Sequence, residues 1–159
     1  MMALILTTGC SHYRLGTGTT PPFHTVYVAP VTNRTLLPQA RAIVSTQIRE
    51  ALARDGRVSL VNSPESADAT LYIEIVDYHR DVAAVRERDT GLARKYDVTL
   101  GVDCTLRERD GMVLFGKRRI EATREAFTDA GQLQSEYQTV PLLAEVLGKK
   151  IAHAALDVW

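Results

Sequence analysis

The most constraining feature of the sequence is the stretch from residue 96 to residue 106, in which apolar and polar residues alternate strictly. The apolar positions of this stretch are Tyr96, Val98, Leu100, Val102, Cys104 and Leu106. Side chains of a β-strand point alternately to the two faces of a sheet, so the pattern predicts a long strand with one buried and one solvent-exposed face. Other elements must then cover the apolar face of this sheet.

A hairpin turn is predicted directly after this strand, where Asp110 and Gly111 follow each other. A three-residue loop over 109–111, with Gly111 in the left-handed conformation, would set Glu108 opposite Met112. The resulting register places three apolar pairs on one face: Leu106 with Leu114, Leu100 with Ile120, and Val98 with Ala122. A two-residue loop would place charged residues opposite the apolar face, so we reject it.

Other segments carry the periodicity of strands or of amphipathic helices. Strands are expected over 25–29, 58–61 and 71–85, and helices over 39–55 and 140–158. Pro38 and Gly56 suit the start and the end of the first helix. Pro141 lies either in the first turn of the second helix or inside a helix that begins earlier. In the strand over 71–85 the apolar parity changes, which predicts a bulge near Val76.

The order of elements is then β-α-β-β-β-α, and it predicts an α+β fold. We expect a two-layer sandwich in which a mostly antiparallel sheet is covered on one face by two helices. The length of the chain suits one folded unit, which we place at residues 25–159.

The first ten residues end in Gly9-Cys10 after a short apolar run, a pattern typical of the end of a secretory signal. This ending resembles the bacterial lipobox, whose cysteine is cut and acylated, although Thr7 stands where the lipobox usually has leucine. The positively charged n-region is missing, as expected if the true start lies upstream. We therefore expect a signal-peptide remnant over 1–9 and a lipidated tether over 10–24; the alternative is a frayed apolar terminus with an incidental cysteine.

A lipid on Cys10 would determine the cellular compartment of the chain. The resemblance to the lipobox implies a diacylglycerol and an N-acyl chain on Cys10, and several chains together anchor a protein firmly. Ser11 follows the cysteine, and by the same resemblance it permits sorting to the outer membrane. The mature chain would then face the periplasm. No other cofactor is expected.

The sequence contains none of the common catalytic or nucleotide-binding motifs. Lys plus Arg and Asp plus Glu each number 19, and this neutral balance argues against a nucleic-acid partner. Asp77, His79 and Asp81 share one face of a strand and could hold a metal, but a solvated strand face is the simpler interpretation. Cys104 has the parity of the core, so we expect it to be buried and inert. The chain is therefore not expected to be an enzyme or to bind a metal.

Basic residues gather around the turn that precedes the long strand, close to several acidic residues. The candidates for an anion site are Arg86, Arg88, Arg94 and Lys95. Charge alone leaves two interpretations open, namely an anion site and a solvated rim of mixed charge. A second basic group, over 117–119, lies on the last strand.

Several short segments together resemble the lipopolysaccharide-assembly lipoprotein family. The start of the mature chain, 10–15 (CSHYRL), has one residue more than the Cys-Gly-Tyr-x-Leu start of that family. The other matches are 28–35 (VAPVTNRT), 67–71 (ADATL) and 93–98 (ARKYDV). No single segment is specific, because other periplasmic lipoproteins share the end of the first strand.

The resemblance implies a function in biogenesis of the Gram-negative envelope. Members of the family plug the outer-membrane β-barrel that exports lipopolysaccharide, and they bind lipopolysaccharide through basic residues, one of them near the turn where this chain has Arg86 and Arg88. A second basic residue, before the last helix, has no counterpart over 127–140. The alternative is a structural periplasmic lipoprotein of another envelope machine, such as an accessory subunit of a secretion channel.

The lipid on Cys10 can be tested directly. When the chain is expressed behind a complete signal sequence and cells are labelled with palmitate, we expect label on the wild-type chain and none on Cys10→Ala. Equal label on the two chains would show that Cys10 is not the attachment site.

Overall fold

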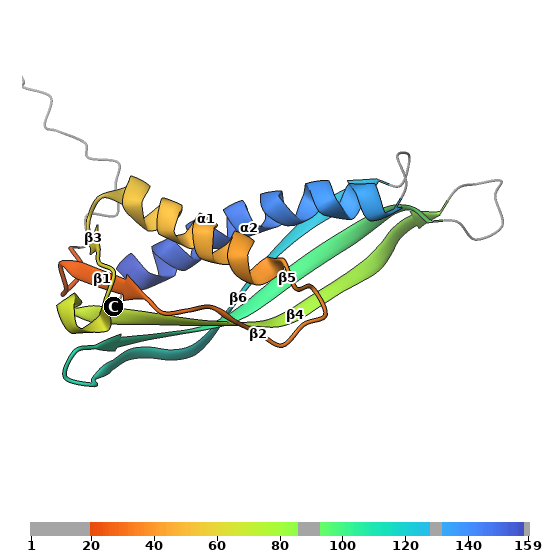
Figure 1. The fold of residues 1–159 in the computed structure, drawn as a ribbon. Helices are drawn as coiled ribbons and strands as arrows, with labels where there is room; N and C mark the ends of the chain where they lie inside the picture. The colour runs from red at the N-terminus through yellow and green to blue at the C-terminus, as the bar shows by residue number, and fades with distance from the viewer. Residues whose placement is uncertain (1–19, 86–92, 128–131, 158–159) are drawn as a thin grey trace, which may run out of the picture.

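The computed structural model describes residues 20–85, 93–127 and 132–157. The described residues form a β-sheet, and two helices cover one of its faces (Figure 1). In chain order the elements are β1 (Thr25–Val28), β2 (Thr32–Asn33), α1 (Ala40–Asp55), β3 (Ser59–Leu60), the short 3-10 helix η1 (Pro64–Ser66), β4 (Ala69–Val85), β5 (Ala93–Glu108), β6 (Val113–Phe127) and α2 (Gln132–Leu156).

The sheet has six strands, and its main path runs in the order β3-β1-β4-β5-β6. The three long strands β4, β5 and β6 are antiparallel, whereas β1 pairs in parallel with β3 and β4. The predicted α+β fold is thus confirmed, including the mostly antiparallel sheet. The predicted order β-α-β-β-β-α counts three strands between the helices, whereas the structure has four, β3 to β6. The two-residue strand β2, which pairs in parallel with β4, was not predicted because two residues are too few to show a periodicity.

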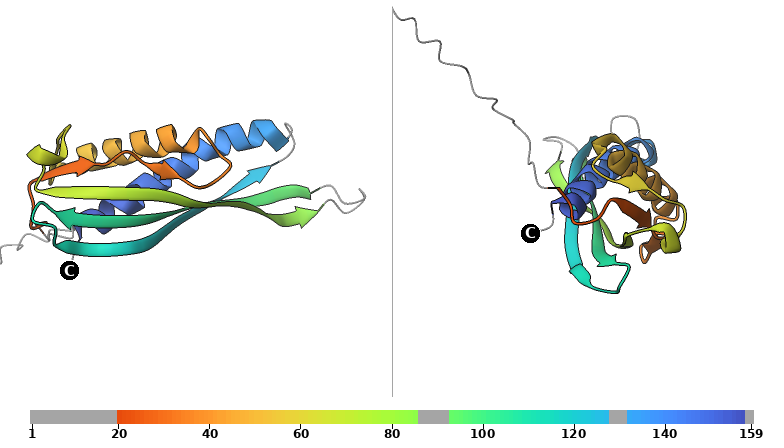
Figure 2. Two further views of the ribbon diagram at one scale, coloured as in Figure 1. Left: turned by 60° about the horizontal axis from the view of Figure 1, so that its bottom comes forward. Right: turned by 90° about the vertical axis from the view of Figure 1, so that its left-hand side faces the viewer.

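Both helices lie side by side on the same face of the sheet (Figure 2). The core between the two layers is aliphatic, and its largest fully buried side chains include Leu71, Ile75, Leu100, Leu106, Ile48, Leu52, Leu143, Leu147 and Ile151. At Gly148 of α2 the helices approach closely, since a Cβ atom there would lie 2.8 Å from the carbonyl oxygen of Gln47 in α1. One apolar face of the sheet is therefore buried and the other is left to solvent.

The ends of the helices largely agree with the sequence. Helix α1 stops at Gly56, whose φ of +74° is left-handed and whose N–H donates to the carbonyl oxygen of Leu52. Helix α2 begins at Gln132, so Pro141 lies inside a helix that starts earlier, the second of the two alternatives. The bulge near Val76 is also confirmed, because the pairing of β4 with β5 skips this residue between Ile75 and Asp77.

The hairpin loop between β5 and β6 is predicted correctly, but the register beyond it is not. The N–H of Glu108 donates to the carbonyl oxygen of Met112 at 2.8 Å, and Gly111 has a φ of +93°, as a three-residue loop requires. Further along the strands, Leu106 pairs with Phe115 instead of Leu114 and Leu100 with Ala122 instead of Ile120. Val98, expected opposite Ala122, pairs with Arg124.

The physical reason is an irregularity in β6 close to Lys117. The register shifts on both sides of Leu106, and Lys117 has a left-handed φ of +44°. These shifts leave Arg118 opposite the buried Cys104, on the face that we expected to be wholly apolar. The guanidinium of Arg118 lies 4.4 Å from the centre of the Phe115 ring and donates to the carbonyl oxygen of Ala154 in α2. A long cationic side chain thus covers apolar surface there.

The burial of the alternating strand gives a stability prediction. Leu100 is fully buried, whereas Leu36 in the segment before α1 is fully exposed. Leu100→Asp should lower the free energy of unfolding by roughly 3–5 kcal/mol, because it removes core packing and buries a carboxylate without a partner. The matched change Leu36→Asp should alter it by less than about 0.5 kcal/mol.

Chemical denaturation followed by circular dichroism measures both variants. Thr99 precedes Leu100, and the alternating pattern predicts that its side chain is exposed. It is nevertheless a poor control position, because Thr99 is only 6% exposed and its hydroxyl lies 2.9 Å from that of Thr123. Similar unfolding midpoints for the two Leu→Asp variants would contradict the assignment of the buried face.

Candidate functional site

The hairpin of β4 and β5 extends past the two helices at one end of the molecule (Figure 1). We call this the distal end and define it by Val82, Lys95, Tyr96 and Phe127. Val82 pairs with Tyr96, and Lys95 pairs with Phe127. Helix α2 also begins at this end, since it follows β6 after a short connection (Figure 2).

The predicted anion site falls at the distal end, but the structure describes only part of it. Arg86 and Arg88 lie outside the described residues, as does Cys10. Arg94 and Lys95 belong to the first residues of β5. The ammonium group of Lys95 lies 2.5 Å from the carboxylate of Glu125 across the sheet, so its charge is largely balanced.

Large apolar side chains at the distal end were missed by the sequence reasoning. Val82, Phe127 and Tyr137 are 61%, 52% and 70% exposed. They come from β4, β6 and α2, respectively. Their strand partners Tyr96 and Lys95 are consecutive in β5, so Val82 and Phe127 lie on opposite faces of the sheet at this end. Only the end of the strand pattern at Phe127 hinted at these side chains, because their exposure beyond the helices depends on the tertiary fold.

The middle of the open sheet face is polar and internally balanced. The Arg119 guanidinium lies 2.8 Å from the carboxylate of Glu121 and 3.4 Å from those of Asp77 and Asp103. It lies flat on the sheet because Gly101 beneath it has no side chain; a Cβ there would be 3.0 Å from an Arg119 nitrogen. These hydrogen bonds, that to Glu121 foremost, raise the pKa of Arg119 above its ordinary value. The charged side chains in the middle of this face are therefore paired with one another.

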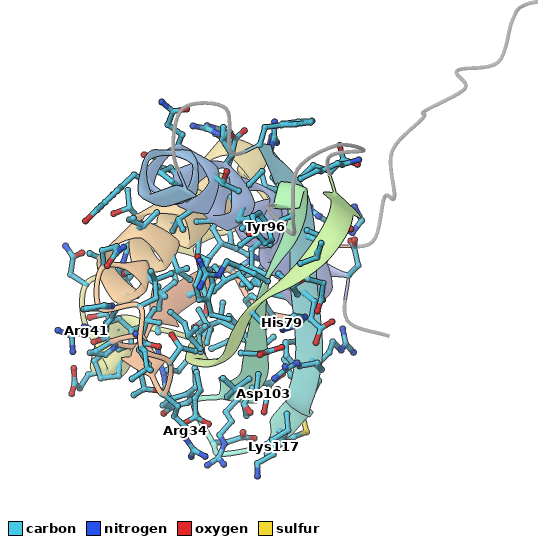
Figure 3. The ribbon with its side chains drawn as sticks, turned by 90° about the vertical axis from the view of Figure 1, so that its right-hand side faces the viewer. Arg34, Arg41, His79, Tyr96, Asp103 and Lys117 are labelled. Atoms are coloured by element: carbon cyan, nitrogen blue, oxygen red, sulfur yellow. The ribbon has the colours of Figure 1, made fainter. Side chains whose placement is uncertain are left out.

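His79 joins the same face (Figure 3). Its ring nitrogens lie 2.9 Å from Asp77 and 3.4 Å from Asp81, and the hydrogen bond to Asp77 is the main cause of the raised pKa of His79. Among the described residues, no group of three histidine, cysteine or acidic side chains is placed to hold a metal ion. The side chains of His79 and Asp81 are 46% and 73% exposed, so this part of the face is in contact with solvent.

Cys104 is buried in the core, as predicted. Burial is the main cause that raises the pKa of its thiol to about 12, so the thiolate is not available as a nucleophile at neutral pH. In the part of the chain that the structure describes, no helix is both long and apolar enough to cross a membrane.

A family model for lipopolysaccharide assembly (LptE) matches residues 23–152 of the chain. The chain belongs to the LptE family. This match covers the whole sheet and most of α2, so it includes both the polar sheet face and the distal end. The family is one of lipopolysaccharide assembly, in agreement with the resemblance identified in the sequence. A search of curated proteins finds no match.

Solved structures share the fold of this LptE-family chain at low sequence identity. The rare lipoprotein B from Shewanella oneidensis is 15% identical, with 82% of this chain and 91% of that chain covered and a TM-score of 0.52. The uncharacterized lipoprotein B from Nitrosomonas europaea is 19% identical, with 92% and 88% covered and a TM-score of 0.53. Protein XCC0632 from Xanthomonas campestris is 10% identical, with 90% and 89% covered and a TM-score of 0.69. At these identities the likeness concerns the fold alone.

Proposed function

We propose that this chain is a lipid-anchored protein of the outer membrane that assembles with, and plugs, the β-barrel that exports lipopolysaccharide. In this proposal Cys10 carries the lipid, the folded domain faces the periplasm, and the distal end contacts lipopolysaccharide. Membership of the LptE family supports the general role. The specific contacts are argued from the two surfaces described above.

The observation that carries the glycolipid contact is the composition of the distal end. Lipopolysaccharide is an amphiphile whose phosphates and acidic sugars are polyanionic and whose acyl chains are apolar. Exposed apolar side chains, Val82 and Phe127 of the sheet and Tyr137 of α2, lie at the end of the molecule where β5 begins with Ala93 and Arg94 and where the sequence places Arg86 and Arg88. Guanidinium groups pair well with phosphate and carboxylate. This combination matches both halves of the ligand.

The contact with the barrel is argued from the open sheet face. The lumen of an outer-membrane barrel is lined by polar side chains. A plug inside it must present a polar surface without a large excess of one charge. The network of Arg119 with its three carboxylates has this character. We therefore expect this middle part of the sheet face, around Arg119, to lie against the barrel wall.

A pull-down tests the barrel assembly. When the tagged full-length chain is isolated from solubilised outer membranes of its own organism, we expect a large β-barrel protein to co-purify in near-equal amount. Recovery of a secretion-channel ring in place of the barrel would support the alternative of another envelope machine and contradict our proposal.

Charge reversal at the hairpin tests the glycolipid contact. The double variant Arg86→Glu/Arg88→Glu should weaken binding of labelled lipopolysaccharide by an order of magnitude or more, since each hydrogen bond to a charged group contributes about 1.5–3 kcal/mol. The matched control Arg41→Glu/Arg54→Glu reverses two exposed charges on α1 and should bind within about twofold of the wild-type chain.

Circular dichroism confirms that the variants are folded before binding is compared. The sequence places Arg86 and Arg88 next to a predicted turn, where side chains are usually solvated, so we expect the double variant to fold. Unchanged affinity in a folded double variant would remove the hairpin from the proposed site.

A further inference from the structure

A concave region lies on the open sheet face, centred on Tyr72 of β4 and away from the distal end. Tyr72 pairs with Thr105 of β5, and its side chain is 47% exposed. Two shallow hollows flank its ring. One is lined by Pro30, Thr32, Glu74, Thr105 and Lys117 among others, and the second by Thr105 and Arg107. We call Tyr72, Thr105, Arg107 and Lys117 the Tyr72 platform.

The two cations of the Tyr72 platform differ from the other cations of this face. Arg119 has three carboxylate partners, Lys95 pairs with Glu125, and Arg34 lies 2.7 Å from Glu74. Among the described residues, neither Arg107 nor Lys117 has a carboxylate partner. Arg107 instead lies 5.9 Å from the centre of the Tyr72 ring. Two cations are thus held beside one exposed aromatic ring with their charge available to a ligand.

The backbone of Lys117 has a conformation that is unfavourable for a residue with a side chain. Its φ of +44° is left-handed, and its N–H donates to the Thr105 hydroxyl at 3.1 Å. A glycine would adopt this conformation without the steric cost that a side chain brings. The irregularity brings Lys117 to the hollow beside Tyr72, on the same side of the molecule as Arg34 and Asp103 (Figure 3).

We infer that the Tyr72 platform binds an acidic or phosphorylated saccharide. The negative face of an aromatic ring attracts the C–H groups of a sugar ring, and the tyrosine hydroxyl can reach its polar edge. Arg107 and Lys117 suit phosphate or carboxylate substituents. Thr105, Glu74 and Asp103 supply partners for sugar hydroxyls. The charges of Glu74 and Asp103 are balanced by Arg34 and Arg119, so they do not repel an anionic ligand strongly.

The inference concerns a different site from the distal end, and for its class of ligand it rests on the proposed function. It is tested with a lipid-free probe, the phosphorylated core oligosaccharide released from lipopolysaccharide by mild acid. Calorimetric titration of the purified full-length chain should show binding of this probe. It should show at least tenfold weaker binding to Arg107→Ala/Lys117→Ala, and unchanged binding to the control Arg41→Ala/Arg54→Ala on α1.

Single substitutions separate binding from a structural role. Tyr72→Phe keeps the ring and should retain binding, whereas Tyr72→Ala should lose it. Lys117→Gly removes the cation and the backbone strain together. We expect this variant to have an unfolding midpoint no lower than that of the wild-type chain and yet to bind the probe several-fold more weakly.

Three outcomes would overturn the inference. They are no binding of the probe to the wild-type chain, equal binding by the folded Arg107→Ala/Lys117→Ala variant, and equal binding of a neutral dextran oligosaccharide. Phosphatase treatment of the core oligosaccharide identifies which anionic group of the probe is bound. Lost binding after treatment indicates the phosphates, and retained binding indicates the sugar carboxylates. Retained binding in Arg86→Glu/Arg88→Glu would show that the two sites are separate.

Discussion

The close packing of two helices on one face of the sheet is the constraint on which the rest of the structure depends. It is possible because Gly148 has no side chain where α2 meets the backbone of α1 at Gln47. With both helices on one side, the alternating strand β5 can bury Leu100 and its neighbours while the opposite face stays open. A helix displaced to the other face would cover the polar residues and leave the apolar ones in water.

This one-sided arrangement divides the open face into regions of different character. In the middle, Arg119 and its carboxylates balance one another, so the surface is polar without an excess of charge. At the distal end the hairpin outreaches the helices, and apolar side chains such as Phe127 are left exposed. Near the other end, the cations beside Tyr72 have no carboxylate partner among the described residues. This division suits the two contacts that we propose, one with a polar barrel wall and one with a charged amphiphile.

The fold could be predicted well from the sequence because its main signals are local. The alternation in β5, the turn at Gly111 and the stop at Gly56 each depend on a few neighbouring residues. The register of β5 and β6 could not be predicted, since the left-handed conformation of Lys117 has no signature in a residue type that rarely adopts it. The candidate cations near the turn could be proposed from the sequence for the same local reason, as they lie close together in the chain. The exposure of Val82, Phe127 and Tyr137 at one end, and the carboxylate partners of Arg119, depend on the folded chain.

The central claim is that the distal end meets lipopolysaccharide in the envelope, and site-specific photo-crosslinking in living cells tests it most directly. A photoreactive phenylalanine analogue is placed at Phe127, which is 52% exposed at the distal end, or at Ala53, which is exposed on α1 at the opposite end (Figure 1). After irradiation and immunoblotting, we expect a lipopolysaccharide adduct from position 127 and none from position 53. Adducts of equal yield at the two positions, or an adduct only at position 53, would contradict this account.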